Sequence, residues 1–165
     1  MSFEMPSYVI DLISFFDGLP GWLEYVVITW IPVIELRWAI PWAVLNAEQV
    51  YLPLILVANL LIFWPGYYFL EFAYERFPEG GWLHRKFEKI RAKVHPLVEK
   101  YGFWGLAVFV AIPLPGSGAY AGTAAAWLLD MEPKRAFVSV SLGVTGAFLL
   151  VWALSEVVGF GIRSM

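Results

Sequence analysis

Two long apolar stretches of this chain are interrupted by prolines and polar residues, and these interruptions constrain the fold more than any other feature. The first interruption runs from Ile31 to Pro41 and includes Glu35 and Arg37, and the second runs from Ile112 to Tyr120. In hydrocarbon, no water satisfies the backbone N–H and C=O groups that such a break frees. A break therefore persists only where protein or a wet cavity surrounds it. The pattern favours a transporter or a channel-like protein over a soluble enzyme.

Composition supports a membrane location. The 165 residues are 60% hydrophobic and 15% charged, with a mean hydropathy of +0.67, whereas soluble proteins average about 25% charged residues. Because a spanning helix needs about 20 residues, we expect a single membrane domain over residues 1–165 without an appended soluble enzyme domain. No set of nucleophile and base is visible. We therefore expect a multi-pass protein of the cell membrane that is not an enzyme.

Metal and nucleic-acid chemistry find little support in the sequence. The chain has no cysteine, and its two histidines, His84 and His95, are separated and make a poor metal constellation. We expect no metal and no cofactor. We also expect no nucleic-acid partner, because the basic residues lie where a cytoplasmic lipid surface would attract them.

Hydropathy predicts the same order of elements twice along the chain. The first half should contain an interfacial helix over residues 5–17, two half-helices within residues 22–45 and a full span over residues 51–74. The second half should contain an amphipathic basic surface helix over residues 75–100, a broken apolar segment over residues 102–130 and a full span over residues 136–160. The first span should kink at Trp64-Pro65-Gly66, because proline interrupts helical hydrogen bonding.

Each half is thus predicted to form a surface helix, a re-entrant helical hairpin and a transmembrane helix. The repeats cover about residues 5–74 and 82–160. If each hairpin enters and leaves on the same side, each half crosses the membrane an odd number of times, and the halves are inverted. We predict an all-α integral membrane fold built on this inverted repeat. Four full spans are the alternative.

Charge bias favours the re-entrant arrangement. It places residues 75–101 and the 130–135 loop on one face, where they collect nine of the eleven basic residues. By the positive-inside rule this face is cytoplasmic, so both termini are expected outside. Four full spans would separate Lys134 and Arg135 from the basic segment, which is a weaker sorting of charge.

Glu35 and Arg37 are the ionisable residues most central to a broken stretch. Low-dielectric surroundings destabilise the charged form of a carboxyl group, so Glu35 is a candidate proton carrier. Arg37 presents a planar fork that suits phosphate or carboxylate. The alternative is structural: the two side chains pair with each other, or Glu35 binds backbone N–H groups at the start of the half-helix that follows it.

The second interruption has the composition of an anion cradle. Prolines stop the helix, glycines admit close approach, and a new half-helix from about Ala119 offers free N–H groups and the positive end of its dipole. A tight turn that bonds only to neighbouring backbone is the alternative. The candidate substrate-binding residues are Glu35, Arg37, Asn59, Pro115, Gly116, Ser117, Gly118 and Tyr120.

Two segments carry a resemblance to a known family. Ile31-Pro32-Val33-Ile34-Glu35-Leu36-Arg37 with Ala39-Ile40-Pro41, together with Ala111-Ile112-Pro113-Leu114-Pro115-Gly116-Ser117-Gly118, resembles the small multidrug export protein family. The layout is also similar to DedA and VTT-type membrane proteins. That resemblance implies two facing re-entrant hairpins and proton-linked handling of lipid-linked phosphate. The chain departs from these relatives because its last span has no obvious second intramembrane arginine.

These observations lead to one main function and two alternatives. The main expectation is a proton-coupled transporter or flippase in which Glu35 exchanges a proton while Arg37 and the Gly116–Gly118 backbone hold an anionic amphiphile, such as a lipid-linked phosphate. The alternatives are proton-coupled export of small amphiphilic drugs and a non-transporting membrane scaffold. Expected partners are membrane lipid, a proton and the small-molecule substrate. A homodimer that shields polar surface is compatible with so small a body.

Overall fold

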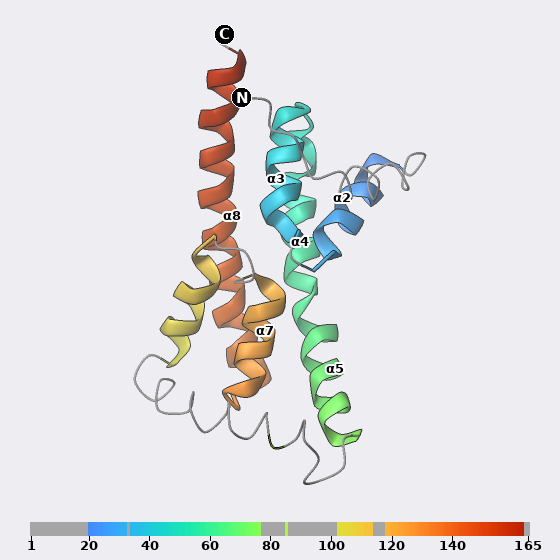
Figure 1. Cartoon of the computed structure of the whole chain (residues 1–165), viewed down its shortest axis with the longest axis vertical. Coiled ribbons are helices and arrows are strands. Elements are labelled where there is room, and N and C mark those ends of the chain that lie inside the picture. Colours follow the sequence, from blue (N-terminus) through green and yellow to red (C-terminus); the bar gives the residue numbers. More distant parts are fainter. Residues whose placement is uncertain (1–19, 33, 77–84, 86–101, 114–117, 164–165) are drawn as a thin grey trace.

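The described part of the chain is helical. The computed structural model describes residues 20–32, 34–76, 85, 102–113 and 118–163, and within these ranges it contains helices and no strand. The prediction of an all-helical fold is therefore confirmed. The longest helices lie along the long axis of the molecule (Figure 1). The predicted surface helices over residues 5–17 and 75–100 lie almost entirely outside the described residues.

Two apolar helices are long enough to cross a bilayer. One runs over Gln49–Arg76 and the other over Pro133–Gly161. The first comprises η1 (Gln49–Tyr51), α4 (Leu52–Leu61) and α5 (Phe63–Arg76), and the second is most of α8 (Pro133–Arg163). Only 39% of each apolar window is buried inside the chain, and the outward side chains include Phe69, Leu154 and Phe160. So large an apolar surface suits contact with lipid rather than with water.

The two long helices run antiparallel. Gln49, at the start of the first, donates a hydrogen bond to Glu156, near the end of the second, at 2.7 Å between Nε2 and Oε1. Further along, the Phe63 and Phe137 rings lie 5.4 Å apart between centroids, and the Tyr67 hydroxyl donates to the Met131 carbonyl at 2.9 Å. Residue numbers thus rise along one helix and fall along the other. An inverted repeat requires this opposition, although the inversion itself stays a prediction.

The first long helix bends where Pro65 removes a hydrogen bond. Proline has no N–H to donate to the carbonyl four residues earlier, that of Leu61. Accordingly α4 ends at Leu61, α5 begins at Phe63, and the Ile62 N–H instead bonds to the Asn59 carbonyl at 3.2 Å. The predicted kink is present, one turn before the proline that causes it (Figure 1).

Four shorter helices flank the two predicted breaks. They are α2 (Gly21–Trp30), α3 (Glu35–Leu45), the helix Gly102–Ala111 and α7 (Ala119–Leu128). At a rise of about 1.5 Å per residue, none of them crosses about 30 Å of hydrocarbon alone. The interruptions fall at Pro32 and Pro113, and α7 begins at the predicted Ala119. The first one is shorter than predicted, because Pro41 lies inside α3 without ending it. Insertion of these helices as re-entrant hairpins stays a prediction.

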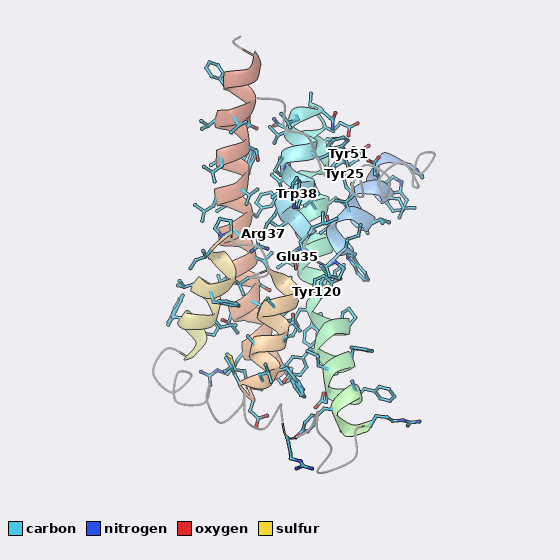
Figure 2. The ribbon with its side chains drawn as sticks, viewed as in Figure 1. Tyr25, Glu35, Arg37, Trp38, Tyr51 and Tyr120 are labelled. Carbon is cyan, nitrogen blue, oxygen red and sulfur yellow. The ribbon has the colours of Figure 1, made fainter. Side chains whose placement is uncertain are left out.

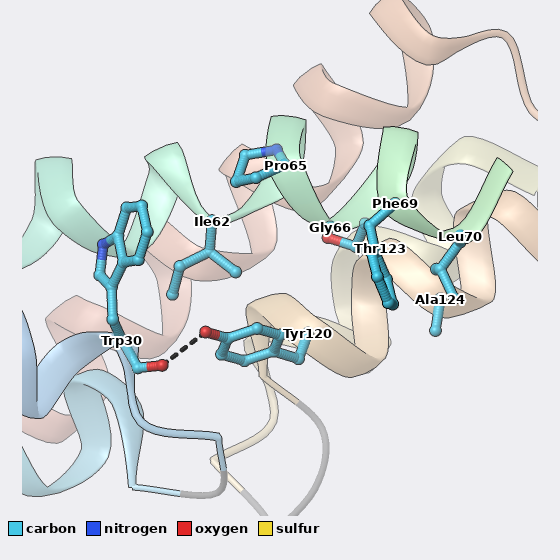
Figure 3. Close-up of a pocket in the computed structure, with 9 residues that line it drawn as sticks. All are labelled: Trp30, Ile62, Pro65, Gly66, Phe69, Leu70, Tyr120, Thr123 and Ala124. Atoms are coloured by element: carbon cyan, nitrogen blue, oxygen red, sulfur yellow. Dashed lines mark hydrogen bonds between the residues drawn. The ribbon is translucent and has the colours of Figure 1, made fainter. Parts of the chain in front are cut away.

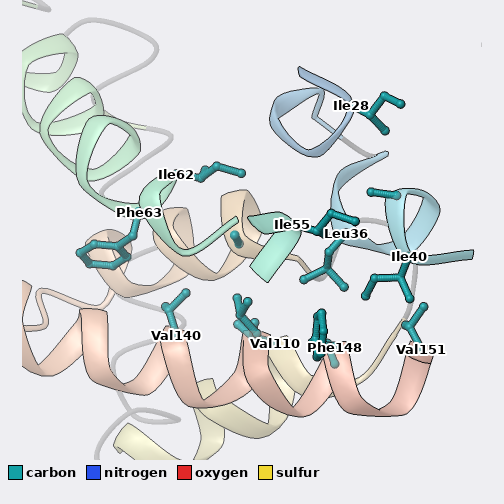
Figure 4. Packing of buried hydrophobic residues seen from close by; sticks show 14 of the residues in the cluster. Ile28, Leu36, Ile40, Ile55, Ile62, Phe63, Val110, Val140, Phe148 and Val151 are labelled. Atoms are coloured by element: carbon teal, nitrogen blue, oxygen red, sulfur yellow. The ribbon is translucent and has the colours of Figure 1, made fainter. Parts of the chain in front are cut away.

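The apolar core lies where α8 meets the shorter helices. Fully buried side chains come from each neighbouring element: Ile40 of α3, Ile55 of α4, Val110 of the helix Gly102–Ala111, Ala119 of α7 and Val144 of α8. Figure 4 shows these layers meeting along α8. Long branched side chains and small residues alternate here, which lets short helices pack closely against a long one.

Several described basic residues lie near one end of the molecule. The end of α5 carries Arg76, and the start of α8 carries Lys134 and Arg135. These two helix ends lie at the same end of the molecule, because Tyr74 of α5 stacks edge-on against Trp127 of α7, just before α8. Glu48 lies at the opposite end of the first long helix. The end that carries the basic residues also carries the acidic Glu75 and Glu132, so the topology predicted from charge stays a prediction.

Candidate functional site

Glu35 is the first residue of α3 and has an unusual backbone. Its φ is +48°, in the left-handed region that residues other than glycine seldom adopt. Such a conformation costs on the order of 1–3 kcal/mol and persists only when surrounding contacts hold it. The Glu35 residue is only 3% exposed. The contacts of its carboxylate account for this placement.

The Glu35 carboxylate binds the N-terminus of a helix from the other half of the chain. Oε2 accepts a hydrogen bond from the Ala119 N–H at 3.2 Å, and Oε1 accepts a longer one from the Tyr120 N–H at 3.4 Å. The first N–H groups of a helix have no partner within the helix, and the positive end of the helix dipole favours an anion there. Glu35 therefore caps α7 from 84 residues away.

Arg37 completes this junction from the first turn of α3. Its Nη1 lies 3.1 Å from Glu35 Oε2, and the two side chains are 11% and 4% exposed, respectively. The Arg37 Nη2 also donates a long bond of 3.4 Å to the Ile112 carbonyl, at the end of the helix before the second break. The pair thus joins α3 to both segments that flank the second interruption (Figure 2).

Gly118 permits this contact. A Cβ atom built at Gly118 would overlap the Glu35 carboxylate and approach Arg37 Nη1 to 2.5 Å. Glycine lets a backbone approach a charged group without a side chain between them. The second break therefore lies directly against the charged pair of the first.

The other predicted site residues fall into three groups. Tyr120 joins the junction through its backbone N–H. Asn59 is fully buried in α4, and its amide makes no hydrogen bond to any part of the chain that the structure describes. Pro115, Gly116 and Ser117 lie outside the described residues. Of the predicted set, the structure brings together Glu35, Arg37, Gly118 and Tyr120.

A pocket of about 470 Å³ lies next to this junction, between α5 and α7. Figure 3 shows the residues that line it and the bond that the Tyr120 hydroxyl donates to the Trp30 carbonyl at 2.5 Å. Phe69, which is 68% exposed, marks a side open to the surroundings. The lining residues are Trp30, Ile62, Pro65, Gly66, Phe69, Leu70, Tyr120, Thr123 and Ala124.

Sequence reasoning missed most of this pocket. Only Tyr120 was among the candidate site residues, because apolar residues in a membrane helix give no local sign of lining a cavity. One signal was present: Pro65-Gly66 predicted the kink, and both residues line the pocket. Among the described residues, no group of three or more His, Cys, Asp or Glu side chains gathers as a metal site would require.

Two apolar helices long enough to span a bilayer and a buried charged pair, in an all-helical described part of the chain, are typical of an integral membrane protein. Comparison with protein families identifies it further. The model of the family described as "Putative small multi-drug export protein" matches residues 35–150, so the chain belongs to this family. The resemblance seen in the sequence is thereby confirmed. No curated protein and no solved structure matches the chain.

Proposed function

We propose that this protein is a proton-coupled membrane transporter of a small anionic amphiphile, with Glu35 as proton carrier and Arg37 and the N-terminus of α7 as the donors for the anionic head group. The family supports a transporter for small molecules. The observation that carries the proposal is the Glu35 carboxylate, buried and bound both to Arg37 and to the Ala119 N–H.

In this arrangement the protein's own carboxylate occupies the anion cradle. The donors that a phosphate or carboxylate head group would use, a guanidinium and the N–H groups of a helix N-terminus, already bind Glu35. A substrate anion therefore competes with Glu35 for the same donors.

Protonation changes the outcome of this competition. A hydrogen bond to a charged group is worth about 1.5–3 kcal/mol. A protonated Glu35 carries no charge, so each of its bonds becomes weaker than this. The donors then prefer an anionic head group. Proton binding and substrate binding thereby favour each other, and this coupling is reciprocal. Transport in this scheme breaks no covalent bond and therefore requires no enzymatic chemistry.

Export of small cationic drugs is the second candidate, and the pocket favours it. Trp30, Phe69 and Tyr120 place aromatic rings in its lining, and aromatic faces attract cations. The Arg37 charge, which would repel a cation, is paired with Glu35 at 3.1 Å. Head-group charge therefore distinguishes the two candidates.

Flux in proteoliposomes tests the proposal. The probes are a pyrenylbutyl phosphate and its trimethylammonium counterpart, with a trapped dye that reports internal pH. We expect the wild type to move the phosphate together with protons, Glu35→Gln to lose the proton signal, and Arg37→Ala to lose phosphate flux. Glu71→Gln and Arg76→Ala are matched controls, because they make similar changes in the same chain away from the junction.

Three results would overturn the proposal. Equal flux in wild type, Glu35→Gln and Arg37→Ala, with all three folded, would leave the charged pair a structural role and favour the scaffold. Flux of the trimethylammonium probe alone would favour drug export. Phosphate flux without proton movement would remove the coupling.

A further inference from the structure

We infer that the pocket between α5 and α7 binds the apolar tail of the transported amphiphile, which enters sideways from the bilayer with its head group toward Glu35. This inference rests on the proposed function and adds the tail site and the route of entry. The pocket volume of about 470 Å³ falls in the range of small-molecule sites, about 300–1,000 Å³.

The lining selects for an apolar ligand. Three lining residues carry a polar side-chain group, and each group donates to backbone: Trp30 Nε1 to Ala58 at 3.0 Å, Tyr120 to Trp30 at 2.5 Å and Thr123 to Ala119 at 2.7 Å. With these donors engaged, the pocket presents rings, aliphatic carbons and methyl groups (Figure 3). A polar head group buried here would lose its hydration without compensation.

The bend in the first long helix creates the space. The helix is interrupted at Ile62, between α4 and α5, and Gly66 in the first turn of α5 contributes no side chain to the wall. A Cβ at Gly66 would lie 3.4 Å from Thr123 Cγ2, in ordinary contact. A longer side chain at this position would therefore fill the pocket rather than distort the backbone.

Tyr120 connects the pocket to the charged junction. Its ring lines the pocket, its hydroxyl bonds to α2, and its N–H bonds to Glu35 at 3.4 Å. A ligand whose tail lies against this ring has its head within reach of the first turn of α7. The exposed Phe69 and Trp30 leave the outer side open toward surrounding lipid. Because the volume of about 470 Å³ is that of a small-molecule site, its occupant in this inference is a single-tailed amphiphile rather than a two-tailed bilayer lipid.

Photolabelling in lipid nanodiscs tests this site. The probes are a decyl phosphate and a phosphatidylcholine, each with a diazirine in the acyl chain, and labelled residues are mapped by mass spectrometry. We expect the decyl phosphate to label residues 62–70 and 119–124, and unlabelled decyl phosphate to compete. Gly66→Leu should reduce this labelling by roughly tenfold or more, equivalent to losing at least about 1.4 kcal/mol of binding.

Gly161→Leu is the matched control, because a Cβ at Gly161 meets no atom within 4 Å. It should label like the wild type. Labelling spread equally over the outer faces of α5 and α8, or phosphatidylcholine labelling of the pocket that decyl phosphate does not displace, would overturn the inference. Competition in the wild type decides the question even if Gly66→Leu fails to fold.

The two proposals fail separately. Competed labelling of the pocket together with unchanged flux in Glu35→Gln would retain the tail site and reject proton coupling at Glu35. Loss of proton coupling in Glu35→Gln without pocket labelling would do the reverse.

Discussion

The backbone of Gly118 lies against the carboxylate of Glu35 so closely that no side chain fits between them. This contact joins the two interruptions of the apolar sequence into one junction. It also explains how the N–H groups of α7 reach an acid from the other half of the chain.

Replacing Gly118 with alanine should displace the Glu35 carboxylate. The added methyl group overlaps that carboxylate, and such overpacking typically costs about 1–3 kcal/mol. We expect a lower melting temperature in detergent and reduced phosphate flux. Gly161→Ala, in open space, should change neither. Equal melting temperatures for the two variants would contradict the close packing.

Removing Glu35 alone should cost more stability than removing it together with Arg37. Glu35→Ala leaves the mostly buried guanidinium without this carboxylate, and breaking such a pair costs about 3–5 kcal/mol. The double variant Glu35→Leu/Arg37→Met should recover much of this loss and show no flux. Thermal unfolding followed by circular dichroism measures both changes. A double variant less stable than Glu35→Ala would count against the ion pair.

Tyr120→Phe separates the hydroxyl from the ring. It removes the bond to the Trp30 carbonyl and should lower stability by about 1 kcal/mol. The ring still lines the pocket, so decyl phosphate labelling should persist, whereas Tyr120→Ala should lose it. Tyr68→Phe, at an exposed tyrosine, is the control for both measurements. Abolished labelling in Tyr120→Phe would show that the hydroxyl, and not the ring, forms the site.

Asn59→Leu should raise the melting temperature. The Asn59 side chain is fully buried, and neither its oxygen nor its nitrogen bonds to a described residue. Each such buried polar group costs about 1–3 kcal/mol, and leucine has a similar size without it. Unchanged flux in the stabilised variant would assign Asn59 no part in transport. A destabilised variant would show that the amide has a partner.

Local rules were sufficient for the order of the elements that the structure describes. Pro65 predicted the kink, and the proline and glycine break predicted a new helix from about Ala119, because helix interruptions depend on backbone chemistry at the site itself. The all-helical class followed from composition and hydropathy. These features do not depend on how distant segments pack.

The group that occupies the anion cradle could not be predicted in this way, because it is brought there by tertiary packing. From the sequence, Glu35 and the Gly118 turn were separate groups that either hold a guest or bond only to their own neighbours in the chain. Their direct contact links residues 35 and 119 and has no local signature. The pocket was equally hidden, because its walls come from α2, α5 and α7 and consist mainly of ordinary apolar side chains.

The bond from Ala119 to Glu35 also sets an order of events during biosynthesis. Because 84 positions separate these residues, Glu35 leaves the ribosome long before the N-terminus of α7 that it caps is made. Until then, the Ala119 N–H and the Ile112 carbonyl, which bond to Glu35 and Arg37, have not been synthesised. Maturation of the first half must therefore wait for synthesis of the second.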